Sequence, residues 1–214
     1  MARPQCSRCC RPASHCLCPL IPDLASHTRV LILQHHSETG HALNTARLAA
    51  LGLRNAQLWV GERFEALEAL LAAEMEGVAL LFPDESGREP ACGAIPSKPG
   101  LLLVPDGSWR KARKILHLNP CLKCLPRISL PAGQVSRYRI RKAPMAGALS
   151  TVEAVVQVLN RLEAPTRFDE LLRPFEALIE GQIEAMGEDT FQRNHVGKGA
   201  DTYATTSPEP DRST

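Results

Sequence analysis

Short apolar runs alternate along the chain with stretches whose apolar residues recur every three to four positions. The runs at 77–82 and 100–105 are apolar on both faces and bounded by Gly or Pro, which is typical of strands buried in a parallel sheet. We predict strands over 29–34, 56–60, 77–82, 100–105 and 127–130. The amphipathic stretches predict helices over 43–53, 63–76, 108–116, 150–163 and 167–186.

Strands that alternate with helices predict an α/β fold: a mostly parallel sheet with helices on both faces. A chain of 214 residues buries enough apolar surface to need no disulfide. We divide it into an N-terminal extension (1–27), a main domain (28–193) and a tail (194–214). The tail is rich in Thr, Ser, Pro and Gly, so we expect it to be disordered.

No apolar run approaches the length of a membrane span, and the N-terminal MARPQCSRCC lacks the apolar core of a signal peptide. We therefore expect a soluble cytoplasmic protein without a membrane partner. Nothing in the sequence indicates an obligate protein partner.

Four of the eight cysteines form one compact array, C-x2-C-x6-C-x-C, at Cys6, Cys9, Cys16 and Cys18. Two closely spaced pairs joined by a short loop offer four thiolates to one ion, and this donor set predicts a closed structural zinc site. An iron–sulfur cluster is the rival interpretation. Cys10 is a spare thiol that could take the place of Cys9.

The net charge of +2 hides a strong local asymmetry. Residues 98–142 contain eleven Lys or Arg and a single acidic residue, Asp106. Such a block predicts an anionic partner, and the alternative is a solvated basic face. The zinc module either extends this surface or braces the fold. For contacts to the phosphates or bases of such a partner, which is RNA if the resemblance described below holds, we select Arg110, Lys111, Arg113, Lys114, Arg137, Arg139 and Lys142.

Ligands of parallel α/β folds bind beyond the carboxyl ends of the strands. Three loops qualify: 82–87, 105–109 and the run from 136 to 151. Asp106, alone in the basic block, is a candidate general base or a binder of a cationic ligand group, or else it caps the following helix. Trp109 either stacks on a purine or covers the sheet.

Two further motifs have structural explanations. Ser150 and Glu153 have the spacing of a capping box, so we favour a cap over a ligand contact for Glu153. His35, His36 and His41 follow a predicted strand without metal-ligand spacing, and we interpret them as loop structure.

The segment LLLVPDGSWRKARK resembles the signature of the DTW-domain family, with Ser108 where that family usually has Thr. Other blocks match in the same order, although His36 stands where the family more often has Pro. Together the blocks span roughly residues 6–160. They are the cysteine array, Gln34-His35 with Glu38, Asn44-Thr45, and Leu149-Ser150-Thr151-Val152-Glu153-Ala154.

This resemblance implies a tRNA-uridine aminocarboxypropyltransferase, related to the SPOUT methyltransferases and their knotted core. The implied co-substrate is S-adenosylmethionine, whose 3-amino-3-carboxypropyl group moves to N3 of a uridine and leaves 5′-methylthioadenosine. In bacteria the implied target is the variable-loop uridine at tRNA position 47. Asp106 is then the catalytic candidate. The expected S-adenosylmethionine contacts are Pro83, Ser108, Trp109, Arg141, Leu149, Ser150 and Thr151.

Two other functions stay open at this point. One is a SPOUT-like RNA methyltransferase that uses the same co-substrate. The other is a zinc-containing RNA-binding protein without catalysis, in which Asp106 is only a helix cap.

Overall fold

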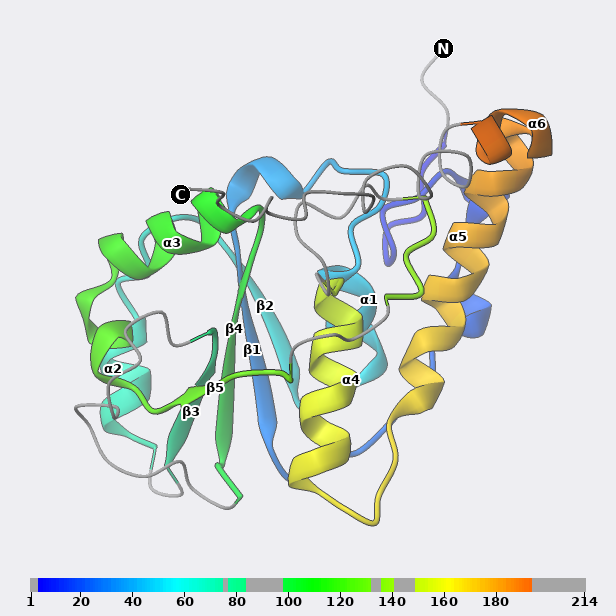
Figure 1. Ribbon diagram of the computed structural model, residues 1–214. Helices are drawn as coiled ribbons and strands as arrows, with labels where there is room; N and C mark the ends of the chain where they lie inside the picture. The colour runs from blue at the N-terminus through cyan, green and yellow to red at the C-terminus, as the bar shows by residue number, and fades with distance from the viewer. Residues whose placement is uncertain (1–3, 75–76, 84–97, 132–135, 141–148, 194–214) are drawn as a thin grey trace, which may run out of the picture.

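The computed structural model describes residues 4–74, 77–83, 98–131, 136–140 and 149–193 (Figure 1). Their strands form one sheet in the order β2-β1-β4-β3-β5, and every pairing is parallel, which confirms the predicted α/β class. The strands are β1 (Arg29–Gln34), β2 (Ala56–Val60), β3 (Val78–Leu81), β4 (Leu101–Asp106) and β5 (Arg127–Ile128). The helices are α1 (Ala46–Gly52), α2 (Leu67–Ala72), α3 (Trp109–Leu118), α4 (Thr151–Leu162), α5 (Arg173–Met186) and α6 (Glu188–Phe191).

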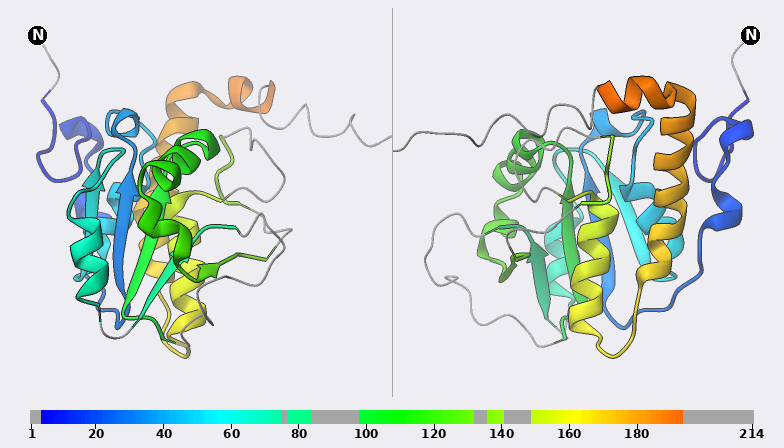
Figure 2. Two further views of the ribbon diagram at one scale, coloured as in Figure 1. Left: turned by 90° about the vertical axis from the view of Figure 1, so that its left-hand side faces the viewer. Right: turned by 45° about the vertical axis from the view of Figure 1, so that its right-hand side comes forward.

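Helices cover both faces of the sheet, as predicted (Figure 2). Side chains of a strand alternate between the faces, so β1 contributes Val30 and Ile32 to one hydrophobic cluster and Leu31 and Leu33 to the other. Helices α1, α4 and α5 pack in the first cluster, and α2 and α3 in the second. This two-sided burial explains why the strands read as continuous apolar runs.

The second helix is shorter than the predicted 63–76, because a buried amide fixes the preceding segment as a turn. Asn119 accepts a hydrogen bond from the Phe64 N–H at 2.9 Å and donates one to the Glu62 carbonyl at 2.7 Å. Helix α2 therefore begins only at Leu67.

Two other boundaries also differ from the prediction. The expected strand 127–130 pairs only as far as Ile128, since its partner β3 ends at Leu81. The expected helix 167–186 splits into a 3-10 turn, η5, and α5. Pro174 lies in the first turn of α5, where a backbone N–H has no partner within the helix, so the missing N–H of proline costs nothing. Farther inside a helix the proline ring would clash with the preceding turn, so the α-helix does not extend back to residue 167.

The N-terminal extension forms a small module with two short 3-10 helices, η1 (Ala13–His15) and η2 (Cys18–Leu20). Leu17 is buried in the main cluster, and Leu20 and Ile21 pack against it. The module lies beside α5 (Figure 2). The extension is thus anchored to the domain by apolar contacts.

Within the described residues, no helix has the length and apolar character needed to cross a membrane. The connection from β5 to α4 contains 132–135 and 141–148, so the knot that the resemblance implies falls outside the described residues. The tail predicted over 194–214 also falls outside them.

Candidate active site

A cavity of about 750 Å³ lies at the carboxyl ends of β3, β4 and β5, against the start of α4. This volume suits a ligand the size of a nucleoside with an attached amino acid. The three loops expected to converge all contribute to its wall, through residues 82–83, 105–109 and 149–151. Parallel strands end at one edge of the sheet, which is why these distant segments meet.

Six of the seven residues predicted to contact S-adenosylmethionine line this one cavity, and Arg141 lies outside the described residues. Their roles in binding stay predictions. No sequence pattern indicated the apolar side of the wall, to which Leu130, Tyr138 and Ile140 contribute. The six are Pro83, Ser108, Trp109, Leu149, Ser150 and Thr151.

Asp106 is the last residue of β4, and its carboxylate borders the cavity with only 9% of the residue exposed. It accepts hydrogen bonds from Gln34 Nε2 at 2.8 Å and from the Thr151 hydroxyl. The N-cap residue of α3 is Ser108, two positions after Asp106. Between them Gly107 has a φ of +148°, and a Cβ there would lie 3.0 Å from Lys111 Cβ.

A pair of side-chain amides fixes the position of Asp106. Gln34 is fully buried at the end of β1, and its amide exchanges two hydrogen bonds of 3.2 Å with the amide of Asn44. Asn44 also accepts from the Arg47 N–H and donates to the Glu38 carbonyl, both at 3.2 Å. Sequence reasoning noted Gln34 and Asn44 only as part of the resemblance and assigned them no role.

The opposite wall is aromatic and apolar. Phe82 is buried and meets Trp109 edge-on, with 5.6 Å between the ring centroids. The guanidinium of Arg127 lies 5.7 Å from the Phe82 centroid and donates to the Pro83 carbonyl at 3.2 Å. A planar, uncharged ring fits such a wall, whereas a charged group fits the side of Asp106.

The start of α4 contains the predicted capping box. Ser150 accepts from the Glu153 N–H, and Glu153 accepts from both the N–H and the hydroxyl of Ser150, at 2.8 and 2.6 Å. Glu153 is 4% exposed and also binds the Ser136 hydroxyl and the Arg137 N–H. The Ser150 hydroxyl is therefore committed to the cap. A ligand carboxylate at this end would meet the backbone amides at the start of the helix instead.

We expect Glu153→Gln to destabilise the protein by roughly 2–4 kcal/mol, because a neutral amide replaces a buried acceptor that binds four donors. Urea denaturation measures this loss. Glu184→Gln, on the exposed face of α5, is the matched control and should leave the midpoint unchanged. Equal midpoints for the two variants would contradict the structural role of Glu153.

Most of the basic side chains predicted to contact RNA are paired with carboxylates. Lys111 lies 2.7 Å from Glu38, and Lys114 lies 2.7 Å from Glu62. Exposed ion pairs contribute little to stability, so phosphates can replace these carboxylates at low cost. Arg137 pairs with Glu176 and Arg139 with Glu180, whereas Lys142 lies outside the described residues.

His35, His36 and Glu62 also lie close together, but their contacts are hydrogen bonds and ion pairs within the loops that follow β1 and β2. His35 Nε2 lies 2.7 Å from Glu62, and its Nδ1 accepts from the Ser37 N–H at 3.2 Å. The hydrogen bond from Lys114 lowers the pKa of Glu62, and the ammonium disfavours a metal ion there. His41 instead accepts from a neighbouring backbone N–H. These contacts agree with the interpretation of the three histidines as loop structure.

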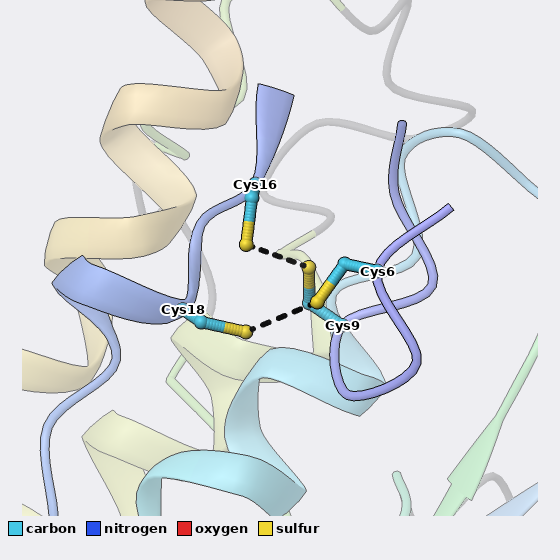
Figure 3. A group of neighbouring side chains, drawn as sticks. All are labelled: Cys6, Cys9, Cys16 and Cys18. Carbon is cyan, nitrogen blue, oxygen red and sulfur yellow. Dashed lines mark hydrogen bonds between the residues drawn. The ribbon is translucent and has the colours of Figure 1, made fainter. Parts of the chain in front are cut away.

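The four cysteines of the predicted zinc site converge on one point (Figure 3). Their sulfur atoms all lie within 4.8 Å of one another, with Cys6 to Cys18 at 3.6 Å and Cys9 to Cys16 at 3.9 Å. Four thiolates on one tetrahedral zinc ion are separated by about 3.8 Å, given zinc–sulfur bonds of about 2.3 Å. The residues present therefore fit a single zinc ion. Cys10 is exposed and outside the group.

Comparison with known proteins gives the family. Residues 3–183, which include the cysteine module and the cavity, match the DTW domain. The chain belongs to the DTW-domain family. In this DTW-domain protein the signature segment 106–109 forms the turn from β4 to α3 and borders the cavity. No solved structure matches the chain.

Three curated relatives carry the name tRNA-uridine aminocarboxypropyltransferase 2. The chain is 31% identical to the Macaca fascicularis protein over 206 residues, which cover 92% of this chain and 69% of the relative. It is 31% identical to the Mus musculus protein, over 85% and 64% of the two chains. It is 32% identical to the Drosophila melanogaster protein, over 85% of this chain and 76% of the relative.

Proposed function

We propose that this DTW-domain protein is a tRNA-uridine aminocarboxypropyltransferase with S-adenosylmethionine as co-substrate. The names of the relatives supply the reaction class. The observation that carries the proposal in this chain is a buried, fixed carboxylate, Asp106, at the edge of a cavity of about 750 Å³. We take the target to be a variable-loop uridine at position 47.

Asp106 is the general base of the proposed reaction. Uracil N3 carries a proton at neutral pH, and Asp106 accepts it as N3 attacks the γ-carbon of the aminocarboxypropyl group. The new bond is N3–Cγ, and the Cγ–sulfur bond breaks. Its electron pair stays on sulfur, so the positive sulfonium becomes the neutral thioether of 5′-methylthioadenosine.

The enzyme must select one of three carbons on the same sulfonium, and orientation is the means. The adenosine lies against Trp109 and the segment 82–83, on the aromatic wall. The amino acid part points to the start of α4, whose amides bind its carboxylate, with Arg141 as a further contact. This arrangement presents the γ-carbon to N3 and turns the methyl group away.

The tRNA binds to the basic side chains of α3 and of the segment 137–142. A uridine in a structured loop of the tRNA is presented to the cavity. The zinc ion is structural and supplies no chemistry to the reaction. We place the enzyme in the cytoplasm, where its substrate is found, and it needs no obligate protein partner.

Contacts to tRNA phosphates make binding depend on salt. We expect the double variant Arg110→Met with Arg113→Met to weaken tRNA binding and to reduce the slope of log K against log salt by about 1–2, while kcat stays within about twofold. Arg54→Met is the control, since Arg54 is exposed and lies before β2, at the opposite edge of the sheet. An unchanged slope in the double variant would remove α3 from the RNA surface.

Nucleoside mass spectrometry of unmodified tRNA, incubated with the protein and S-adenosylmethionine, tests the function. We expect a uridine heavier by one aminocarboxypropyl group, together with released 5′-methylthioadenosine. A gain of one methyl group would instead make the protein a methyltransferase with the same co-substrate. Tight binding without any gain in mass would favour a non-catalytic RNA-binding role.

A further inference from the structure

One buried cation links the cysteine module to the wall of the cavity. Arg11 is only 9% exposed, and its guanidinium reaches across to the segment that precedes α1. It donates to the Ala42 carbonyl and, at 3.2 Å, to the Asn44 carbonyl. The planar fork of Arg suits two neighbouring carbonyls, a pattern that the point charge of Lys does not reproduce.

The backbone of Arg11 is held by two of the four cysteines. The Cys6 N–H donates to the Arg11 carbonyl at 2.8 Å, and the Arg11 N–H donates to the sulfur of Cys9. The guanidinium also interacts electrostatically with Cys9. Four thiolates on one Zn²⁺ leave a net negative charge, which stabilises a buried cation next to them. A zinc ion bound by the four cysteines would therefore hold Arg11 in place through both backbone geometry and charge.

The other end of this connection is Asp106. The segment that Arg11 holds carries Asn44, whose side chain bonds to Gln34, and Gln34 donates to Asp106 at 2.8 Å. Every hydrogen of the two side-chain amides has an acceptor, so a shift of the Asn44 backbone must displace Gln34 or break a buried hydrogen bond.

We propose that Arg11 is a positioning residue that couples metal loading of the cysteine module to the position of Asp106. The order of contacts is zinc site, Arg11, Asn44, Gln34, Asp106. The catalytic half of this inference rests on the proposed function, whereas the coupling itself does not. Of the two roles considered for the module, this proposal favours bracing the fold over extending the basic surface.

Hydrogen exchange of the backbone amides of residues 42–47 measures the coupling in the full-length, zinc-loaded protein. We expect Arg11→Met to accelerate this exchange by about tenfold and to lower kcat by about 10–100-fold, with zinc content and the KM for tRNA unchanged. Arg8→Met removes an exposed cation from the same module and should match the wild type in all four measurements. A role in RNA binding predicts the reverse: a raised KM for tRNA in both variants with kcat unchanged.

A chelator completes the test. Removing zinc from the wild type should accelerate exchange at residues 42–47 more than at the amides of β1 and β4, whereas in Arg11→Met the chelator should accelerate both sets of amides equally. An equal response of both proteins to the chelator would overturn the proposal. Exchange that follows this pattern in a protein without transferase activity would leave the coupling standing and refute the proposed function.

If Arg11→Met loses protection throughout β1 and β4, Arg11→Lys replaces it as the test variant. Lys keeps the charge but not the fork, so we expect intermediate exchange and an intermediate kcat in a fully folded protein. Wild-type exchange and kcat in Arg11→Lys would show that the fork is not required and would overturn the proposal.

Discussion

Asp106→Asn is expected to lower kcat by about three orders of magnitude, because general base catalysis by a positioned side chain contributes about 10²–10⁴. Asparagine keeps the shape of the side chain: its oxygen accepts the hydrogen bond from Gln34 Nε2, and its NH2 group donates to the Thr151 hydroxyl oxygen, so the fold and the cavity remain. Single-turnover formation of modified uridine measures the chemical step directly. Equilibrium binding of tRNA and of S-adenosylmethionine should stay within about threefold of the wild type.

The control for this variant is Asp23→Asn, which neutralises an exposed carboxylate paired with Arg54, far from the cavity. It should retain wild-type turnover. An Asp106→Asn enzyme with more than about a tenth of wild-type activity would assign Asp106 to ligand binding and not to proton transfer. A loss of S-adenosylmethionine affinity with an unchanged single-turnover rate would likewise assign Asp106 to ligand binding.

The cavity was predictable because its parts follow from local rules. Apolar runs bounded by Gly and Pro predict parallel strands, and all parallel strands end at one edge, so the loops after residues 82 and 106 had to approach each other. The start of α4 was equally predictable, since the two residues of a capping box lie three positions apart and can be recognised from the sequence alone. The spacing of the cysteines likewise predicts their convergence.

The network that holds Asp106 was not predictable in this way. Gln34 and Asp106 are 72 positions apart, and no local pattern indicates that these two polar groups share a hydrogen bond. The register of β1 on β4 places them opposite each other, and only the assembled sheet shows that pairing. The shortened second helix has the same origin, because the amide of Asn119 fixes a turn 55 positions away.

The charges show a related limit of sequence reasoning. Counting residues correctly predicts a basic segment, but not that Arg137 and Arg139 meet Glu176 and Glu180. Arg137 and Arg139 lie two positions apart in a tight turn, and their partners lie four positions apart, one helical turn, on α5, so both pairs form together. The free positive charge of this face is therefore smaller than the composition of the segment indicates.

Loss of zinc is the second large effect that we expect. Cys9→Ser removes a buried ligand of the four-cysteine group, so the variant should lose about one zinc ion per chain. Without the metal, Leu17 and its neighbours no longer hold their place on the main core, which costs about 3 kcal/mol of burial and lowers the melting temperature. Metal analysis by mass spectrometry and thermal denaturation with and without chelator measure both effects.

Cys10→Ser is the matched control, because Cys10 is the next residue along the chain but is exposed and outside the group. It should keep its zinc and its melting temperature. Zinc retained in Cys9→Ser but lost in Cys9→Ser with Cys10→Ser would show that Cys10 replaces Cys9 as a ligand. Iron in the purified wild type, with visible charge-transfer absorption, would contradict the zinc assignment itself. The short distances between the four sulfur atoms favour a single ion, since a cluster bonds its thiolates to different iron atoms and so holds them farther apart.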